Sequence, residues 1–278
     1  MKKTLTLILV LVAITIMPGF SIAAQLKLSM LPRYSAEEIN KRIIPLAKYL
    51  SQEIGQPIEP VITADFAQYE KKIKNGEIQI GYENPYIYAL VSTTHEILAM
   101  AIKGADGDKF RGVIITRTDS DIQSISDLKN RKIMVVGRTA AGGYISQKIT
   151  LAEAGIDLEK ECQVSESVGN KQENVILAVY MGEVAAGFIR EAALKKVNKF
   201  IPVDQIRILN KSAWMPNWAF SVDKSLPADV KKNIREALLN LDQNSPVIQA
   251  LDIKGFRYAT DDEYDSIRKA ADLPIPKR

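Results

Sequence analysis

The sequence predicts an α/β protein with two lobes, each a mixed, mostly parallel sheet flanked by helices. Short β-like runs alternate with segments of helical periodicity, the order that builds parallel sheets covered by helices. This alternation occurs as two successive units. β-like connections near residues 110–116 and 203–210 indicate a two-strand hinge, with the second lobe inserted into the first. The expected segments are a signal peptide at 1–24, lobe 1 at 25–110 and 207–278, and lobe 2 at 111–206.

Lobe 1 is expected to begin with a strand over 26–31. Apolar residues at helical spacing, among them Ile39, Ile43 and Leu46, predict a helix over 37–54 that stops at Gly55. The other expected strands are 58–62, 78–82 and 97–102 before the insertion and 218–222 after it. The other expected helices are 66–74, 85–91, 229–241 and 261–271.

Lobe 2 repeats the same alternation without an internal sequence repeat. Glycines punctuate it, because Gly155 and Gly182 each follow a helical segment. The expected strands are 112–116, 132–136, one beginning at Val164, 185–189 and 206–209. The expected helices are 143–154, 172–181 and 190–197, with a short helical turn at 124–128.

The N-terminus has the pattern of an export signal. Lys2 and Lys3 form a basic start, an apolar stretch follows from Leu5, and small residues allow cleavage after Ala23 or Ala24. A retained membrane anchor is the alternative, but a spanning helix needs roughly 20 predominantly apolar residues. No cysteine lies near the cleavage site, so no lipid anchor is expected. We therefore expect a mature protein that diffuses freely in the periplasm.

The composition describes a globular protein. Hydrophobic residues make up 46% and charged residues 25% of the chain. The net charge is +4, and removal of Lys2 and Lys3 lowers it to +2. Basic residues are dispersed among acidic ones, which argues against nucleic acid as a partner. We expect a monomer.

Conventional catalytic and metal-binding motifs are missing from the sequence. Its one histidine, His95, lies in a polar stretch and is expected in a surface loop, and its one cysteine, Cys162, is expected to be buried. This pair cannot form a zinc cluster or a disulfide. No nucleophile elbow, phosphate loop or dinucleotide fingerprint is present. The sequence thus predicts a binding protein without cofactor or metal, although an enzyme using two carboxylates stays open.

Polar and aromatic residues follow the predicted strands, where open α/β sheets bind ligands. In lobe 1, Tyr34 follows the first strand, and Tyr82, Glu83, Asn84 and Tyr86 surround the end of the third. We expect Tyr82 and Tyr86 to line the organic part of a ligand, and either Glu83 or Glu191 to accept an ammonium group.

In lobe 2 the strand ends carry glycines and charges. Thr139 precedes Gly142, Gly143 and Tyr144 at the start of a helix, whose free N–H groups favour anions. Such glycines can instead be only a loop before a helix. The other candidates of this kind are Asn170, Lys171, Arg190, Glu191, Trp214 and Asn217.

Each of these residues also has a structural alternative. Lys171 and Arg190 are individually typical of solvated surface, and Trp214 and Trp218 of a core. In the ligand hypothesis, Lys171 or Arg190 joins the glycine turn in holding an oxyanion, Trp214 adds to the aromatic wall, and Glu191 is the alternative ammonium acceptor.

The sequence resembles the periplasmic substrate-binding components of phosphonate, phosphate and phosphite ABC transporters. The resemblance implies a type II periplasmic binding fold, a ligand clamped between lobes, and delivery to an ABC permease. It places pocket residues at Tyr82, Tyr86, the turn 140–144, Asn170, Lys171 and Glu191. It rests on an ordered series of motifs: Gly81-Tyr82-Glu83-Asn84-Pro85-Tyr86, Phe110-Arg111-Gly112-Val113, Ser126-Asp127-Leu128-Lys129, Ala154-Gly155-Ile156-Asp157, Gly182-Glu183-Val184-Ala185-Ala186 and Pro216-Asn217.

The chain departs from that family in its anion-binding turns. Where the family has a Ser-Thr-Ser-Gly type of turn, this chain has Ala140-Ala141-Gly142-Gly143, and where a Gly-Ser-His type is frequent it has Gly169-Asn170-Lys171. Gly112 stands where a serine is usual. Because several charge-assisted hydrogen bonds hold a desolvated oxyanion, we expect weakened or redirected phosphonate binding unless Lys171, Arg33 or Arg190 compensates.

The leading hypothesis is therefore a solute-binding protein for a small anionic or zwitterionic compound. The alternative is a sensory accessory that reports its ligand to a membrane histidine kinase or chemoreceptor and has no transport role.

Overall fold

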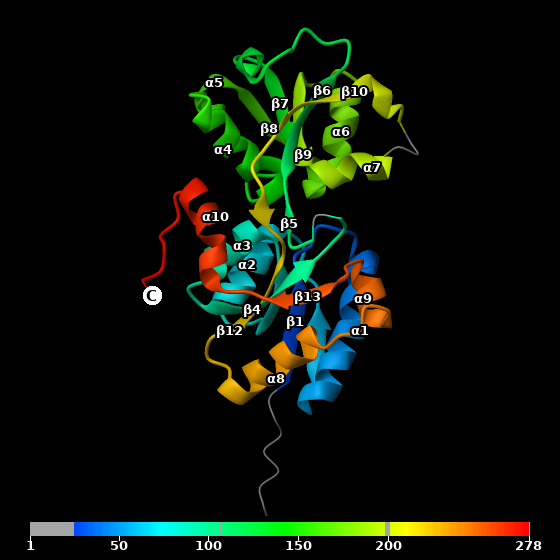
Figure 1. The fold of residues 1–278 in the computed structure, drawn as a ribbon, viewed down its shortest axis with the longest axis vertical. Helices are drawn as coiled ribbons and strands as arrows, with labels where there is room; N and C mark the ends of the chain where they lie inside the picture. The colour runs from blue at the N-terminus through cyan, green and yellow to red at the C-terminus, as the bar shows by residue number, and fades with distance from the viewer. Residues whose placement is uncertain (1–24, 106, 198–200, 278) are drawn as a thin grey trace, which may run out of the picture.

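The computed structural model describes residues 25–105, 107–197 and 201–277. The expected signal peptide at 1–24 lies outside these residues. Within them, no helix combines the length and apolar character that crossing a membrane requires. The molecule consists of two α/β lobes, drawn one above the other in Figure 1, with the short strand β5 between them.

Lobe 1 is built on a six-stranded mixed sheet. Its strand order is β13-β4-β12-β3-β1-β2. β1 pairs with β2 and β3 in parallel, whereas β12 runs antiparallel to both β3 and β4. The strand bounds are β1 Leu26–Met30, β2 Ile58–Val61, β3 Ile80–Glu83, β4 His95–Ile102, β12 Ala219–Asp223 and β13 Gly255–Tyr258.

Side-chain caps start the first three helices of lobe 1. Ser35 caps α1 by accepting from the N–H of Glu38, and Gly55 ends it in the left-handed region at φ 68°. Asp65 and Asn84 cap α2 and α3 in the same way. The bounds are α1 Ala36–Ile54, α2 Phe66–Lys74, α3 Pro85–Val91, α8 Ala228–Leu239, α9 Pro246–Leu251 and α10 Asp265–Ala270.

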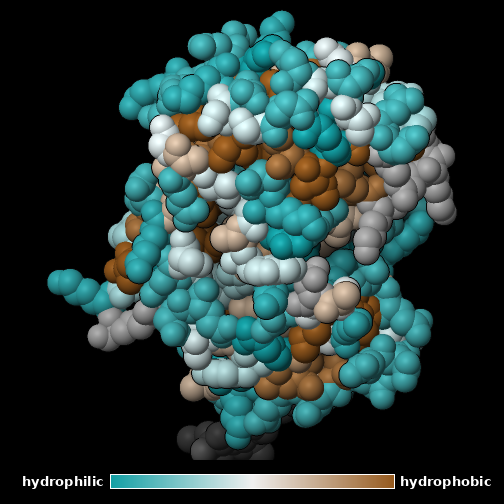
Figure 2. All heavy atoms as spheres, turned by 45° about the horizontal axis from the view of Figure 1, so that its top comes forward, coloured by the Kyte–Doolittle hydropathy of each residue, from teal (hydrophilic) through white to brown (hydrophobic). Residues whose placement is uncertain are grey.

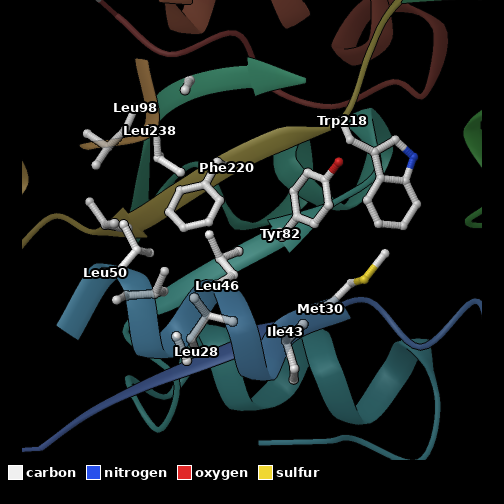
Figure 3. Packing of buried hydrophobic residues seen from close by; sticks show 14 of the residues in the cluster. Leu28, Met30, Ile43, Leu46, Leu50, Tyr82, Leu98, Trp218, Phe220 and Leu238 are labelled. Carbon is white, nitrogen blue, oxygen red and sulfur yellow. The ribbon is translucent and has the colours of Figure 1, made fainter. Parts of the chain in front are cut away.

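The core of lobe 1 reaches the inner end of its sheet. Figure 3 shows Leu46 and Leu50 of α1 facing Phe220 of β12, with Tyr82 and Trp218 farther along the same core. The Tyr82 and Trp218 rings meet edge to face at 5.2 Å between centroids. Two large aromatic residues therefore bring the core up to the gap between the lobes.

Lobe 2 is built on a five-stranded sheet with apolar clusters against it. Its strand order is β10-β6-β9-β7-β8, parallel for β8-β7-β9 and antiparallel for β6 and β10. The strands are β6 Gly112–Arg117, β7 Lys132–Val135, β8 Gln163–Glu166, β9 Ala186–Arg190 and β10 Ile206–Lys211. The helices are α4 Ser146–Glu153, α5 Leu158–Glu161, α6 Gln172–Tyr180 and α7 Leu194–Val197, and a π-helical turn at Ala141–Ile145 precedes α4.

Two short strands link the lobes. β5, Lys109–Phe110, pairs antiparallel with β11, Met215–Pro216. The chain enters lobe 2 after β5 and leaves it before β11. In the view of Figure 2, polar residues cover most of the surface, and apolar side chains show in patches on both lobes.

Several sequence expectations need correction. His95 begins β4 and is fully buried, with Nδ1 2.9 Å from Ser221 Oγ and Nε2 3.2 Å from the Ile78 carbonyl oxygen, so its expected place in a surface loop was wrong. Cys162 is only partly buried, and its thiol donates to the Leu128 carbonyl at 3.3 Å. The short elements β5, β11, β13, α5 and α9 were not predicted.

Two helices expected in lobe 2 are also broken into pieces. The helix expected over 143–154 begins as the π-helical turn before α4. In place of the helix expected over 190–197, Arg190 ends β9, a 3-10 turn covers Glu191–Ala193, and α7 follows.

Candidate functional site

A cavity of about 460 Å³ lies between the lobes. Lobe 1 lines it with Arg33, Tyr34, Ser35, Glu38, Phe66, Asn84, Lys103 and Trp218. The hinge strand β5 contributes Phe110. Lobe 2 lines it with Val136, Ala140, Ala141, Gly142, Asn170, Lys171, Gln172, Glu173, Arg190, Ala192 and Ala193. The volume lies within the range of small-molecule sites, about 300–1,000 Å³.

A smaller recess of about 20 Å³ adjoins this cavity. Arg33, Lys103 and Arg190 line both spaces, and they come from the loop after β1, the loop after β4 and the end of β9. Tyr34, Tyr82, Asn217, Trp218, Met30 and Leu251 complete the recess. Three cations from separate parts of the chain therefore meet at one small space.

Aromatic rings position the two arginines of the recess. The Arg33 guanidinium carbon lies 4.7 Å from the ring centroid of Tyr34 and 5.2 Å from that of Trp218. The Arg190 guanidinium carbon lies 4.0 Å from the ring centroid of Phe110. Stacking of this kind orders a guanidinium while its N–H groups keep their directions.

Lys103 is held by a different contact. Its Nζ donates to both the carbonyl oxygen and the Oδ2 of Asp252, each at 2.6 Å. Burial lowers the pKa of Lys103, and Asp252 opposes this effect by favouring the charged ammonium.

Two hydrogen bonds cross from one lobe to the other beside the cavity. Asn84 Nδ2 donates to the Thr139 carbonyl at 3.2 Å, and Lys171 Nζ donates to the Arg33 carbonyl at 3.3 Å. The same Asn84 side chain caps α3 by accepting from the N–H of Ile87 at 2.9 Å. The lobes therefore contact each other beside the cavity.

The glycine turn before α4 is shaped by packing. A Cβ on Gly142 would lie 2.7 Å from Phe110 Cε2, and a Cβ on Gly143 would lie 2.5 Å from Val136 Cγ2. Gln147 holds the turn from behind, because its Nε2 lies 3.0–3.1 Å from the carbonyl oxygens of Gly142, Val113 and Ile189. Both glycines are thus required by close side-chain packing, while Gly142 also lines the cavity.

Glu83 faces away from the cavity into the core of lobe 1. It is fully buried and accepts hydrogen bonds from Tyr69 and Ser221, both at 2.6 Å. Burial raises the pKa of Glu83 to about 7, and these two bonds partly offset the rise. Ser221 Oγ also contacts His95, and burial lowers the pKa of that histidine to about 4. The expected role of Glu83 as an ammonium acceptor has no support in this geometry.

The structure brings only part of the predicted site together. The cavity collects Tyr34, Asn84, Gly142, Asn170, Lys171 and Arg190, and the recess adds Tyr82 and Asn217. Thr139 reaches the region through its carbonyl, and Gly143 is packed behind Gly142. Tyr86 is partly buried among the apolar clusters of both lobes and is not among the lining residues.

Three other predicted residues are engaged elsewhere. The Tyr144 hydroxyl donates to Glu159. Glu191 forms ion pairs with Arg111 at 2.6 Å and Lys211 at 3.0 Å. Trp214 is 40% exposed beside the hinge, with the Arg111 guanidinium carbon 4.5 Å from its ring centroid.

Sequence reasoning missed Phe66, Lys103 and Phe110. Lys103 follows β4 directly, so the rule that ligands bind at strand ends could have found it. Phe110 belongs to a two-residue strand that has no periodicity to reveal it. Among the described residues, no group of three or more His, Cys, Asp or Glu side chains is placed to hold a metal ion.

Comparison with known proteins places these features in a family. The model of the family "ABC transporter, phosphonate, periplasmic substrate-binding protein" matches residues 28–264. The tetrathionate sensor histidine kinase TtrS of Salmonella typhimurium is 22% identical over an alignment of 226 residues that covers 70% of this chain. The chain spans only 36% of that relative's length.

Solved structures share the fold. XAC2383 from Xanthomonas citri, bound to chloride ion, superposes with a TM-score of 0.77 at 18% identity, covering 89% of this chain and 99% of that one. PhnD1 from Prochlorococcus marinus, in complex with methylphosphonate, gives 0.76 at 15% identity, covering 89% and 97%. The predicted two-lobed periplasmic binding fold is thereby confirmed.

Proposed function

Because the chain belongs to the family of periplasmic substrate-binding proteins of phosphonate ABC transporters, we propose that its interlobe cavity binds a small anionic or zwitterionic solute for delivery to an ABC permease. The observation that carries this proposal is the charge of the cavity. Of the described residues, four basic ones line it, Arg33, Lys103, Lys171 and Arg190, against two acidic ones, Glu38 and Glu173. Glu38 is in turn paired with Arg42 at 2.5 Å, so the surplus is positive and favours an anion.

The proposed ligand-binding residues are a revised set. It retains Tyr34, Tyr82, Asn84, Gly142, Asn170, Lys171, Arg190 and Asn217 and adds Arg33, Phe66, Lys103, Phe110, Glu173 and Trp218. In this site the cations bind the anionic group, the aromatic rings cover the organic part, and Glu173 accepts an ammonium group where a zwitterion is bound. The proposal involves no catalytic step.

Closure of the lobes is the event that a permease would recognise. Asn84 and Lys171 make their cross-lobe hydrogen bonds only when the lobes meet. A ligand that contacts Arg33 of lobe 1 and Arg190 of lobe 2 favours the closed form through its higher affinity for that form. We further propose export to the periplasm with cleavage near Ala23 or Ala24, and a freely diffusing monomer.

A thermal-shift panel on ligand-stripped protein tests the anion proposal. It contains phosphate, phosphite, alkylphosphonates, alkanesulfonates, thiosulfate, tetrathionate and aromatic acids, with neutral sugars as matched controls. We expect at least one anion, and none of the sugars, to raise the melting temperature, because binding to the native state stabilises it. Stabilisation by no anion, or equal stabilisation by sugars, would contradict the proposal.

The sensory role is the second candidate, and one observation favours it. A relative at 22% identity is a sensor histidine kinase, so a similar lobe pair occurs in a signalling protein. Crosslinking in the native host followed by identification of the membrane partner separates the two roles. Recovery of a permease supports transport, whereas recovery of a histidine kinase or chemoreceptor without a permease supports sensing.

A further inference from the structure

We propose that the recess between Arg33, Lys103 and Arg190 receives an oxygen of the fully ionised oxyanion head of an organic acid, and that the larger cavity beside it, which the same three cations line, holds the rest of the ligand with an apolar body. This inference rests on the proposed function. It narrows the solute from anions in general to those whose head carries no proton when bound, such as a sulfonate or a doubly ionised phosphonate, with an apolar group attached. It also moves the anion site away from the glycine turn before α4.

The charge of the recess supports a doubly charged or strongly acidic head. Three cations line it, and among the described residues no carboxylate does. Asp252 pairs with Lys103 from outside the lining, so cations outnumber carboxylates among the described side chains at the recess. In a partly buried space such a surplus attracts an anion much more strongly than in water.

The hydrogen-bonding groups of the recess also favour full ionisation. Arginine and lysine only donate hydrogen bonds, so they match an oxygen without a proton. The side-chain oxygen of Asn217 already accepts from the N–H of Trp218 at 2.9 Å. Burial raises the pKa of Tyr82, so its hydroxyl stays a donor at neutral pH. A singly protonated phosphonate would place its O–H among donors.

The sizes of the two spaces divide the ligand into a head and a body. The recess holds about 20 Å³, room for about one water-sized group, and therefore suits an oxyanion oxygen. The main cavity is about 460 Å³, and Phe66, Phe110, Val136 and Trp218 give it apolar walls. A ligand consisting only of its oxyanion head would leave most of that space to water, whereas an apolar body gains free energy by displacing it.

A chain-length series tests the two-part site by calorimetry. Alkanesulfonates from methane- to hexanesulfonate are titrated into the ligand-stripped protein, with the matching alkylphosphonates in parallel. We expect affinity to rise about fourfold per buried methylene. A flat series, or the tightest binding by methanesulfonate, would overturn the apolar-body assignment.

The pH dependence of the same titrations tests the ionised head. Lowering the pH from about 8 to about 6, toward the range where phosphate groups take up a proton, should weaken alkylphosphonate binding and leave alkanesulfonate binding unchanged. Equal weakening of both ligands would assign the pH effect to the protein and overturn this part of the inference.

Substitutions locate the head group. Arg33→Gln, Lys103→Met and Arg190→Gln should each weaken sulfonate binding about tenfold or more, since each removes a charge-assisted hydrogen bond. Lys103→Arg should retain most of the affinity, and Lys171→Met, in the cavity but outside the recess, should lose less. Lys160→Met is the surface control, because the Lys160 side chain is 83% exposed and pairs with Asp157. Losses at the recess no larger than at Lys171 would overturn the assignment.

Thermal melting without ligand and the anion panel described above distinguish failure of this inference from failure of the proposed function. Thermal melting without ligand separates lost binding from lost folding in each variant. If the protein binds a panel anion but no member of the two series, the inference fails while the proposed function stands. If it binds no anion at all, both fail.

Discussion

Two strand-to-helix turns face each other across the cavity, and they are stabilised in opposite ways. In lobe 1, the turn after β3 is fixed by its own side chain, because Asn84 caps α3 and Pro85 occupies the first turn of that helix. In lobe 2, the turn after β7 has no side-chain cap and starts as a π-helical turn. Gln147 holds it from behind through three carbonyl contacts.

In the proposed site, the difference separates the residues that shape the cavity from those that would bind the ligand. Close packing leaves the lobe 2 turn with small residues, Ala140, Ala141 and Gly142, facing the cavity. The cations come from neighbouring strand ends: Arg33 and Lys103 in lobe 1, and Arg190 in lobe 2. The glycine turn thus allows close packing, while long side chains beside it supply positive charge to the cavity. The following predictions test this comparison.

The largest stability effect is expected in the support of the lobe 2 turn. Gln147→Met keeps side-chain volume but removes the donor that serves three buried carbonyls. We expect the free energy of unfolding to fall by about 3 kcal/mol, given about 1–3 kcal/mol for each unsatisfied buried group. Chemical denaturation measures it. Gln163→Met is the control, because the Gln163 side-chain amide makes only a long, exposed hydrogen bond of 3.5 Å to the Asn130 carbonyl among the described residues. It should change the free energy of unfolding by less than about 0.5 kcal/mol. Equal losses of stability in the two variants would contradict the account.

The buried network behind the lobe 1 turn should give opposing pH effects. Glu83 has a pKa raised from 4.5 to about 7, so the stability it contributes at low pH is lost as pH rises through that interval. His95 has a pKa lowered from 6.5 to about 4, so its contribution grows as pH rises between those values. The two contributions oppose each other between about pH 4.5 and 6.5.

Single substitutions should reveal the separate pH-dependent contributions of Glu83 and His95 to stability. Relative to the unsubstituted protein, stability of Glu83→Gln should rise with pH over that interval, and stability of His95→Gln should fall, each by up to about 3 kcal/mol. Urea denaturation across the interval measures both. Parallel pH profiles for the two variants would show that the pKa shifts do not govern stability.

The cross-lobe bond of Asn84 should affect closure more than stability. Asn84→Asp retains an oxygen to cap α3 but loses the Nδ2 donor to Thr139. We expect a more open molecule by small-angle X-ray scattering, with nearly unchanged stability. Asn84→Ala should lose the cap as well, at about 1 kcal/mol. An identical scattering profile for Asn84→Asp would show that this bond does not contribute to closure.

The smallest effect is expected at Trp214. Its stacking on Arg111 is exposed and lies outside the cavity, so Trp214→Phe should cost less than about 1 kcal/mol and leave ligand affinity unchanged. The chain has two tryptophans, so this variant makes Trp218 the single fluorescent reporter of the recess. A loss of affinity on this substitution would restore Trp214 to the binding site.

Helices with clear end signals could be predicted from the sequence. α2 and α3 have the expected bounds because Asp65 and Asn84 cap them and Asn75-Gly76 ends α2. The edge strand β13 could not be recognised, since four residues, two of them buried, carry little periodicity. The fold followed from such repeated local signals.

The site was less predictable because it depends on which face each side chain occupies. Tyr82 and Glu83 are neighbours on β3 and point to opposite faces of the sheet: Tyr82 packs against Trp218 and lines the recess, whereas Glu83 contacts Tyr69 and Ser221 on the other face. The sequence predicted that Gly142 and Gly143 form an anion-binding turn. Their close packing against Phe110 and Val136 joins residues distant in the sequence, so the sequence pattern does not reveal it. Trp214 precedes β11 and lies beside the hinge, whereas Trp218 follows β11 and lines the recess.

The most direct test of the central claim is a crystal structure with the tightest-binding anion of the panel. The account predicts the oxyanion head within hydrogen-bond distance of Arg33, Lys103 and Arg190, with the organic body against Phe110 and Trp218 and the lobes closed. An anion held instead by the backbone of the turn 140–143, with the recess empty, or bound outside the cleft, would contradict it.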